Sequence, residues 1–529
     1  MSIDPTLQHL LDTITQMQTD SDQDSKDEDV IKVSDTISVA ASAYESVRNT
    51  LEYDEEHLLR RNAIRRILKR RLGETNMTEL SAKLIKELIW ARYLPNKKIP
   101  TQKIADVTGV LEKYKRMFAS LEEDTKAGQD RYQWLLDVLS TEIEYLVAPP
   151  CIDESLASYA YQMLRQRVQW EMTSIAPEHR DLQLYIAVHR AVLKSNPATL
   201  RYRLLTLYYP AWRTAQANDP VVTEVASHLN TVAESVDTQL NHPASEAVYR
   251  FVRRHSIVFH VLANIAKDNP LAFSKAVIAK EQATITSALT AATKERYSTF
   301  RSKLTRTVIR AAFFLLLTKS ILAILVEYPY ELFILESTDY LPLMVNILFP
   351  PLLLALVGLT VRIPQKKNTE HVLEEANAFL GLGDEMTFLF KERRAWGRGA
   401  LWIIFNTIYA VVFFLTVYLI TKLLGSFGFN GLSIGFFLFF LSLVAYFGLR
   451  IRNSRREYLV VDISGGIFGV LGDILFLPIV RVGRWMAMRA PRVNIFLFFF
   501  DFIIEAPFKA TIDVIESWFA FLREKRDEI

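Results

Sequence analysis

The sequence predicts an all-α protein: a cytosolic multi-helix domain, a four-helix polytopic transmembrane domain, and amphipathic interfacial C-terminal helices. Hydrophobic residues make up 50% of the 529 residues, yet 23% are charged, so the two kinds must lie in different parts of the chain. Four apolar segments are long enough to cross a bilayer core of about 30 Å. Residues 151–300 contain no glycine and no long apolar-polar alternation, which favours helices over strands.

The length predicts more than one structural unit. Residues 18–30 carry six acidic residues against one lysine, so we expect a mostly disordered acidic segment with room for a short helix near residues 6–17. The chain start lacks signal-peptide features, so insertion into a membrane is expected to depend on internal segments.

Composition shifts and prolines divide the chain into five parts. These are residues 1–38 (acidic segment), 39–148 (first helical subdomain), 149–300 (second subdomain, ending in a stalk helix), 301–456 (transmembrane domain) and 457–529 (C-terminal helices).

A basic amphipathic helix is expected within the first subdomain. Arg61, Arg65 and Lys69 recur at helical spacing opposite an apolar row. They could contact anionic lipid, nucleic acid or the acidic segment, or simply form a salt-bridged face. We favour lipid over nucleic acid, because the domain is tethered to a membrane and the run lacks the aromatic residues on which bases stack.

The stalk follows from an absence of helix breakers. Neither proline nor glycine occurs between Pro270 and Pro329. Residues 271–328 are therefore expected to form one helix, or two with a bend, that leaves the soluble domain and becomes the first span.

Loop charges set the predicted topology of the spans, which are residues 308–326, 341–361, 401–424 and 432–449. Residues 327–340 contain four acidic and no basic residues, whereas residues 362–400 contain seven basic residues and residues 450–456 contain four arginines. By the positive-inside rule, both termini face the cytoplasm of a multi-pass plasma (inner) membrane protein.

The C-terminal region has short apolar stretches that are interrupted by charge. We expect interfacial helices under an anionic leaflet, with headgroup contacts from a basic and aromatic run: Arg481, Arg484, Trp485, Arg489 and Arg492. The alternative makes residues 463–480 a re-entrant or fifth segment that pairs with a sixth at residues 493–504.

An intramembrane polar site is the main candidate for transport. Lys319 lies well inside the first span, where a charge is costly and usually faces a bundle interior. The residues that could share a polar path are Lys319, Asn346, Asn406, Asp473 and Asp501. Alternatively, Lys319 extends to the outer surface, and the asparagines join neighbouring helices.

The sequence gives few signs of enzymatic chemistry. Residues 129–300 lack the glycines that phosphate-binding loops need. Cys151 is the only cysteine, and His255 and His260 are five residues apart, which does not match the HExxH spacing. We therefore expect no cofactor and no metal, and place an enzyme third among the hypotheses.

The leading hypothesis is a membrane-anchored structural or interaction protein, whose partners are the bilayer with its anionic headgroups, a cytosolic protein, or another copy of the chain. The alternative is a small transporter or channel with a polar path near Lys319.

Overall fold

Helices make up most of the described chain. The computed structural model describes residues 4–22, 29–33, 56–119, 121, 125–171, 173–336, 339–361, 364, 366–392, 400–460 and 479–485. The helices of the globular part, in chain order, are α1 (Pro5–Asp22), α3 (Glu56–Arg71), α4 (Met77–Trp90), α5 (Gln102–Ala119), α6 (Lys126–Val147), α7 (Cys151–Arg167), α8 (Pro177–Val192), α9 (Pro197–Tyr208), α10 (Pro220–Ser227), α11 (Leu229–Leu240), α12 (Ser245–Asp268) and α13 (Pro270–Ala279).

Several helices begin where the sequence provides a capping side chain followed by proline. The side chain of Asn196 accepts a hydrogen bond from the amide of Thr199 at 3.0 Å, and Asn269 does the same for Ala272. Proline follows each asparagine at the first helical position, where no amide donor is needed. Pro177, Pro197, Pro220 and Pro270 are each the first residue of an α-helix.

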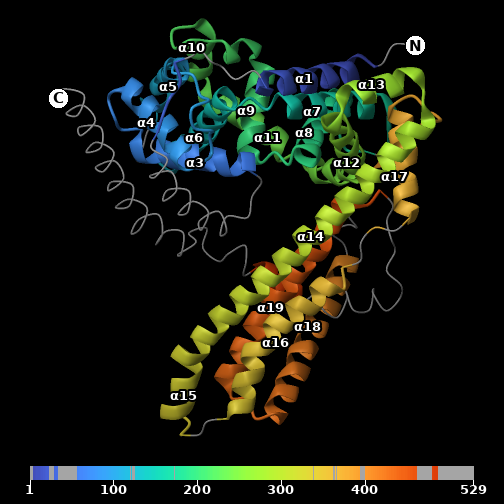
Figure 1. Cartoon of the computed structure of the whole chain (residues 1–529). Helices are drawn as coiled ribbons and strands as arrows, with labels where there is room; N and C mark the ends of the chain where they lie inside the picture. Colours follow the sequence, from blue (N-terminus) through green and yellow to red (C-terminus); the bar gives the residue numbers. More distant parts are fainter. Residues whose placement is uncertain are drawn as a thin grey trace, which may run out of the picture.

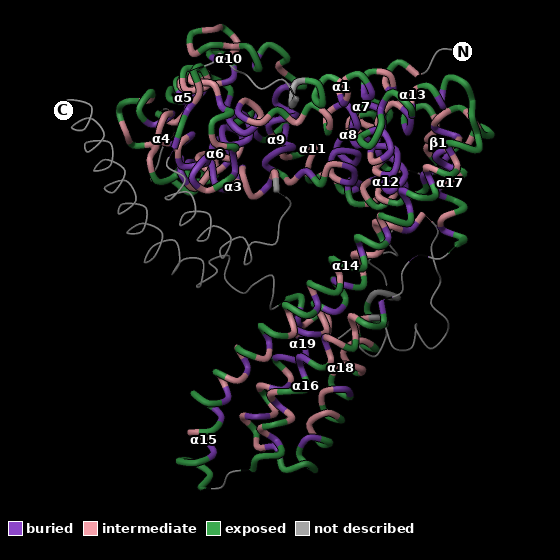
Figure 2. Tube along the Cα trace, in the orientation of Figure 1, coloured by how far each residue is buried: buried purple, intermediate pink, exposed green. Residues whose placement is uncertain are grey.

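The globular part consists of two lobes with separate apolar cores (Figure 1). The first lobe contains α3 to α6 with α9 to α11, and its core includes the fully buried rings of Trp134 and Trp212. A buried polar network crosses this core, because Glu142 accepts hydrogen bonds from Lys113, Tyr114 and Trp212. Figure 2 shows the buried residues concentrated in these two cores.

The second lobe contains α1, α7, α8, α12 and α13. Helix α1 packs against α7 and α13 and buries Leu7, Leu10, Leu11 and Ile14, each at most 2% exposed. This helix includes the short helix expected near residues 6–17 and is longer than expected, and it supplies four apolar side chains to the core. Residues 23–28 lie outside the described residues.

A later segment of the chain completes the second lobe. Helix α17 (Lys366–Phe379) and strand β2 (Phe388–Lys391) come from the connection between the second and third span-length helices. Strand β2 pairs in parallel with β1 (Val168–Glu171), and Val168 lies opposite Phe388. These four-residue strands were not predicted, because they are too short for an alternating pattern to be recognised.

Four helices are long and apolar enough to cross a membrane within the described residues. The first is continuous over residues Gln282–Phe333 and consists of α14 (Gln282–Leu322), the π-helix η2 (Ala323–Glu327) and α15 (Tyr328–Phe333). The others are α16 (Tyr340–Leu359), α18 (Ala400–Ser426) and α19 (Gly431–Ser454). This confirms the four predicted apolar helices.

The stalk was expected to be one helix or two helices with a bend, and the structure contains two helices. Helix α13 ends at Ala279. The next residue, Lys280, has a left-handed backbone (φ 54°, ψ 37°), and α14 begins at Gln282. From there α14 runs from the second lobe along the other span-length helices to the far end of the molecule (Figure 1). Exposed apolar side chains such as Ile309 and Phe313 line its outer face, as expected for contact with lipid.

Close backbone approach holds these helices together. A Cβ at Gly358 on α16 would lie 2.6 Å from a methyl carbon of Val308 on α14, and a Cβ at Gly448 on α19 would lie 2.9 Å from one of Val357. Only glycine allows the helices to pack this closely, as in many membrane bundles.

Candidate functional site

A buried ion pair lies within the first span-length helix. The Nζ of Lys319 is 2.6 Å from Oε1 of Glu327, and both side chains are 0% exposed. The ammonium group also faces the rings of Phe436 and Phe440 on α19, at 5.0 and 4.6 Å from their centroids. Lys319 therefore does not extend to the outer surface, and its charge is compensated inside the bundle.

The π-helix η2 explains how two residues eight positions apart can meet. In a regular α-helix these positions would be turned about 80° from each other around the axis. One wider turn at Ala323–Glu327 holds an additional residue, which brings Glu327 close to the face of Lys319. The glutamate was expected in an outer loop, because the apolar run of the sequence ends just before it.

Asn346 connects this pair to two further helices. From α16, its amide donates to Oε2 of Glu327 at 2.6 Å and to the backbone carbonyl of Ser433 on α19 at 3.2 Å. The Oδ1 atom of Asn346 and the hydroxyl of Ser433 are buried without a hydrogen-bond partner among the described residues. The cluster therefore joins three helices by hydrogen bonds, but two of its buried polar atoms form none among the described residues.

A second carboxylate lies one turn further along. Glu331 is 3% exposed, and its Oε1 accepts a hydrogen bond from the amide of Asn430 at 3.0 Å. The other amide atom of Asn430, Oδ1, accepts from the backbone of Ser433 and caps the start of α19. These contacts hold the start of α19 against α15.

The other predicted polar residues do not join this cluster within the described residues. Asn406 lies half-buried on α18 and is not bonded to Lys319, Glu327 or Asn346. Asp473 and Asp501 lie outside the described residues. Since Lys319, Glu327 and Asn346 are each 0% exposed, the cluster has no contact with solvent in this conformation.

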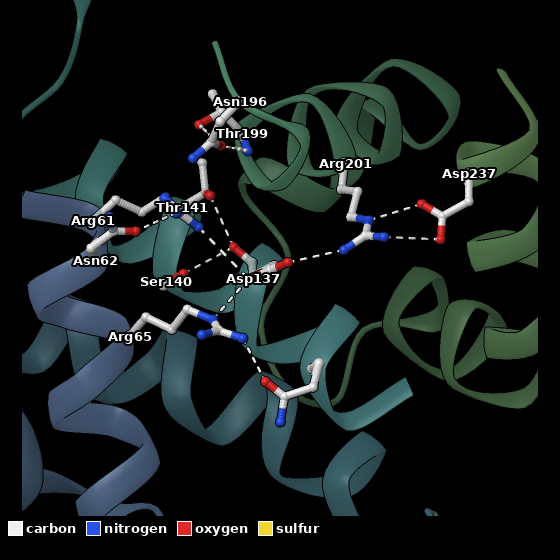
Figure 3. Close-up of polar contacts among 11 residues, drawn as sticks. Arg61, Asn62, Arg65, Asp137, Ser140, Thr141, Asn196, Thr199, Arg201 and Asp237 are labelled. Carbon is white, nitrogen blue, oxygen red and sulfur yellow. Dashed lines mark hydrogen bonds and ion pairs between the residues drawn. The ribbon is translucent and has the colours of Figure 1, made fainter. Parts of the chain in front are cut away.

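The basic helix α3 directs part of its charge into the first lobe (Figure 3). Asp137 on α6 receives Arg65 at 2.8 Å, Arg201 at 2.9 Å and Arg61 at 3.7 Å. Arg61 is only 5% exposed. Two of the three residues expected to contact lipid or a partner are therefore engaged in an internal ion-pair network, while Lys69 is exposed.

The neighbouring arginines of α3 are paired in the same way. Arg60 contacts Glu144 at 3.1 Å, and Arg70 contacts both carboxylate oxygens of Glu87 at 2.7 and 2.8 Å. Burial raises the pKa of Glu144 to about 7, although Arg60 opposes this shift. Helix α3 thus contributes substantially to the stability of the lobe.

The C-terminal basic run is described only in part. Residues 479–485 are helical and lie against α19, where a Cβ at Gly483 would collide with the backbone carbonyl of Ser442. The guanidinium of Arg481 lies 4.7 Å from the ring centroid of Tyr409 on α18, and Arg484 and Trp485 are exposed. These residues therefore lie beside the middle of α19. Arg489 and Arg492 lie outside the described residues.

Metal-binding chemistry is not evident in the described ranges, where no group of three His, Cys, Asp or Glu side chains could hold an ion. His255 and His260 contact other parts of the second lobe. His255 pairs with Glu375 at 3.0 Å and joins α12 to α17, while Nε2 of His260 lies 2.8 Å from the carbonyl of Val192. Both histidines therefore stabilise the second lobe.

The fold and these contacts define an all-α protein with four helices that could span a membrane. Comparison of the chain with protein-family models, curated proteins and solved structures gave no match. Its function is therefore inferred from its side-chain chemistry and helix arrangement.

Proposed function

We propose that the chain is a membrane-anchored structural or interaction protein, which holds a cytosolic helical domain at a fixed position on a plasma (inner) membrane. The observation that carries this proposal is that the second lobe is assembled from three separate parts of the chain. Besides α1, α7, α8, α12, α13 and the start of α14, the lobe contains the segment with α17 and β2, and residues just after α19.

Asn368 is the point at which these parts meet. Its amide donates to the hydroxyl of Tyr297 on α14 at 2.7 Å and to the carbonyl of Tyr458 at 2.8 Å. Its Oδ1 accepts from the backbone of Val460. A domain tied to three of the four long helices cannot rotate independently on a single linker.

The orientation rests on two supporting observations. The segments 366–392 and 455–460 pack at the same end of the long helices as the N-terminal lobes (Figure 1). The same connections carry most of the loop arginines and lysines, which favour the cytoplasm. Both termini are therefore assigned to the cytoplasmic side.

For the C-terminal region, the contact of residues 479–485 with the middle of α19 supports the alternative in which part of residues 463–504 enters the membrane. Interfacial helices remain the proposal for the residues that follow. The exposed Arg484 and Trp485 are suited to reach a headgroup layer from there.

The first lobe is the part that we propose to meet a partner. It projects to one side of the long helices, away from the second lobe (Figure 1). Its exposed faces could receive a cytosolic protein, an anionic lipid surface or another copy of the chain.

A second candidate function, transport, is favoured by one specific observation. Lys319, Glu327 and Asn346 form a buried charged cluster next to a π-helix, and such irregular turns often occur at functional sites. The closed packing around the cluster supports a structural role instead.

Flux measurements on the purified chain in liposomes separate the two functions. The anchor proposal predicts no flux of H⁺, Na⁺, K⁺ or Cl⁻ above that of protein-free liposomes. Flux that disappears in Lys319→Met would contradict the anchor proposal and support transport. A Lys422→Met variant is the matched control, because Lys422 is exposed on α18.

A further inference from the structure

A basic cleft lies between the globular part and the long helices. Its volume is about 990 Å³. One wall comes from the second and first lobes, at α8, α9, α11 and the start of α12, and the other comes from α14 and α19. The cleft therefore lies where the globular part meets the membrane-spanning helices.

The charges of this cleft are unbalanced. Seven lysine and arginine residues line it against three acidic residues. Each acidic residue already has a basic partner on the globular wall or next to it: Asp237 pairs with Arg201 at 2.8 Å, Glu246 with Arg190 at 3.0 Å, and Glu457 with Lys194 at 3.5 Å.

Four cations remain on the opposite wall: Lys303, Arg306 and Arg310 on α14, and Arg450 on α19. All four are exposed, and none has an acidic side chain of the described residues within ion-pair distance. The three on α14 are spaced i, i+3 and i+7, so they share one face of the helix.

The position of these cations relative to the apolar surface identifies the kind of ligand. Directly after Arg306, α14 exposes Ile309 and Phe313, at 62% and 66%. Arg450 follows the exposed Leu449 at the end of the apolar run of α19. The cations therefore lie at the level where the hydrocarbon core ends and lipid phosphates begin.

We propose that this cleft binds the headgroup of an anionic phospholipid, whose phosphate oxygens contact Lys303, Arg306, Arg310 and Arg450. Arginine offers paired N–H donors that match phosphate oxygens, and lysine adds a point charge. The acyl chains lie along the exposed apolar face of α14. The lipid fills the space between the globular part and the long helices and helps to hold them together.

A soluble phosphate compound presents the same oxyanion chemistry, so the source of the phosphate has to be tested. We favour the lipid because Arg310 lies beside the lipid-facing side chains of α14, where a soluble compound would have to compete with headgroups. Phosphatidylglycerol, phosphatidylcholine and sn-glycerol 3-phosphate serve as the three probes.

The test uses the full-length protein in detergent, with lipid binding followed by native mass spectrometry. In the cleft variant, Arg306→Glu and Arg310→Glu reverse two of the four cations. In the matched control, Lys294→Glu and Arg301→Glu make the same charge change at exposed positions of α14 that do not line the cleft. A milder pair, Arg306→Gln with Arg310→Gln, replaces the cleft variant if its folding is impaired.

The proposal predicts that phosphatidylglycerol binds the unaltered protein at least about tenfold more tightly than phosphatidylcholine does. The cleft variant should lose this preference, and the control should keep it. Equal loss in both variants, or in neither, would overturn the proposal, because only a general surface attraction would then act. Binding of sn-glycerol 3-phosphate as tight as that of the lipid would overturn the assignment to a lipid.

Discussion

The ammonium group of Lys319 lies 2.6 Å from the carboxylate of Glu327, on the other side of a π-helical turn, and neither side chain is exposed. Each charge would be strongly destabilising alone in this apolar bundle. Together with Asn346, the pair joins α14, α16 and α19. We expect it to fix the relative positions of these helices.

Replacement of Lys319 with methionine should therefore lower the free energy of unfolding by about 3–5 kcal/mol, because it leaves Glu327 as an unpaired buried charge. Thermal unfolding in detergent measures this loss. The double variant Lys319→Met with Glu327→Met should recover most of it, since no buried charge then remains. Lys422→Met should have little effect, because that lysine is exposed. A Lys319→Met variant as stable as the original protein would argue against a structural role for the pair.

Asp137 should be a critical residue of the first lobe. Its replacement with asparagine removes the charge that receives Arg61, Arg65 and Arg201, and Arg61 is only 5% exposed. We expect a loss of about 1.5–3 kcal/mol in chemical unfolding followed by tryptophan fluorescence. Asp181→Asn is the control, because Asp181 pairs with Arg165 at an exposed site where both side chains are 51% exposed. If both variants lose the same stability, the network has no special importance.

The same network affects how lipid binding by α3 can be tested. Reversal of Arg61 or Arg65 should unfold the first lobe, so reduced vesicle binding by these variants would be ambiguous. Lys69→Glu is the informative change, since Lys69 is exposed. If α3 contacts anionic vesicles, this variant should bind them more weakly while its unfolding midpoint stays unchanged. Unchanged binding would remove Lys69 from the contact surface.

Close packing of α14 on α16 should depend on Gly358. Alanine at this position adds a Cβ that would lie 2.6 Å from a methyl carbon of Val308, which should cost about 1–3 kcal/mol in thermal unfolding. The second change Val308→Ala should restore stability, because it removes both methyl groups. Gly435→Ala is the control, since no atom lies within 4 Å of the Cβ that it would add. Similar losses at both glycines would show that helix approach is not the cause.

Acid should destabilise the second lobe through His260. Burial, with Arg296 nearby, lowers the pKa of this imidazole to about 3 in the folded protein, below the ordinary value of 6.5. Between pH 6.5 and 3 the unfolded chain binds a proton on this imidazole and the folded protein does not. The free energy of unfolding should therefore fall as the pH falls from 6.5 towards 3, by at most about 1.4 kcal/mol per pH unit, whereas His260 should have no such effect above pH 6.5. Unfolding of His260→Gln should depend less on pH over this range. The exposed His228→Gln should keep the original dependence.

Much of the architecture follows from the sequence. Apolar runs define the four long helices, and Asn196 and Asn269 mark helix starts that the structure contains. The assembly of the second lobe does not follow in this way, because α17 and β2 belong to a connection whose partners lie more than a hundred residues earlier.

The candidate site was predictable only in part. The lone charge of Lys319 in an apolar run identified it, but its partner Glu327 lies just beyond that run. A helical period of 3.6 residues would not place the two on the same face, so the π-helix that joins them is not visible in the pattern. The partners of Arg61 and Arg65 were likewise hidden, because ion pairs with Asp137 depend on the packing of α3 on α6.

Fixed attachment of the globular part to the long helices is the central claim, and one distance distribution tests it. Cys151 is exposed and is the only cysteine, so a spin label there and a second at Thr360→Cys, an exposed position where α16 ends, report directly on this attachment. In lipid nanodiscs, double electron–electron resonance should give one narrow distance distribution. A broad distribution, or several separate distances, would show that the domain moves independently and would contradict the account.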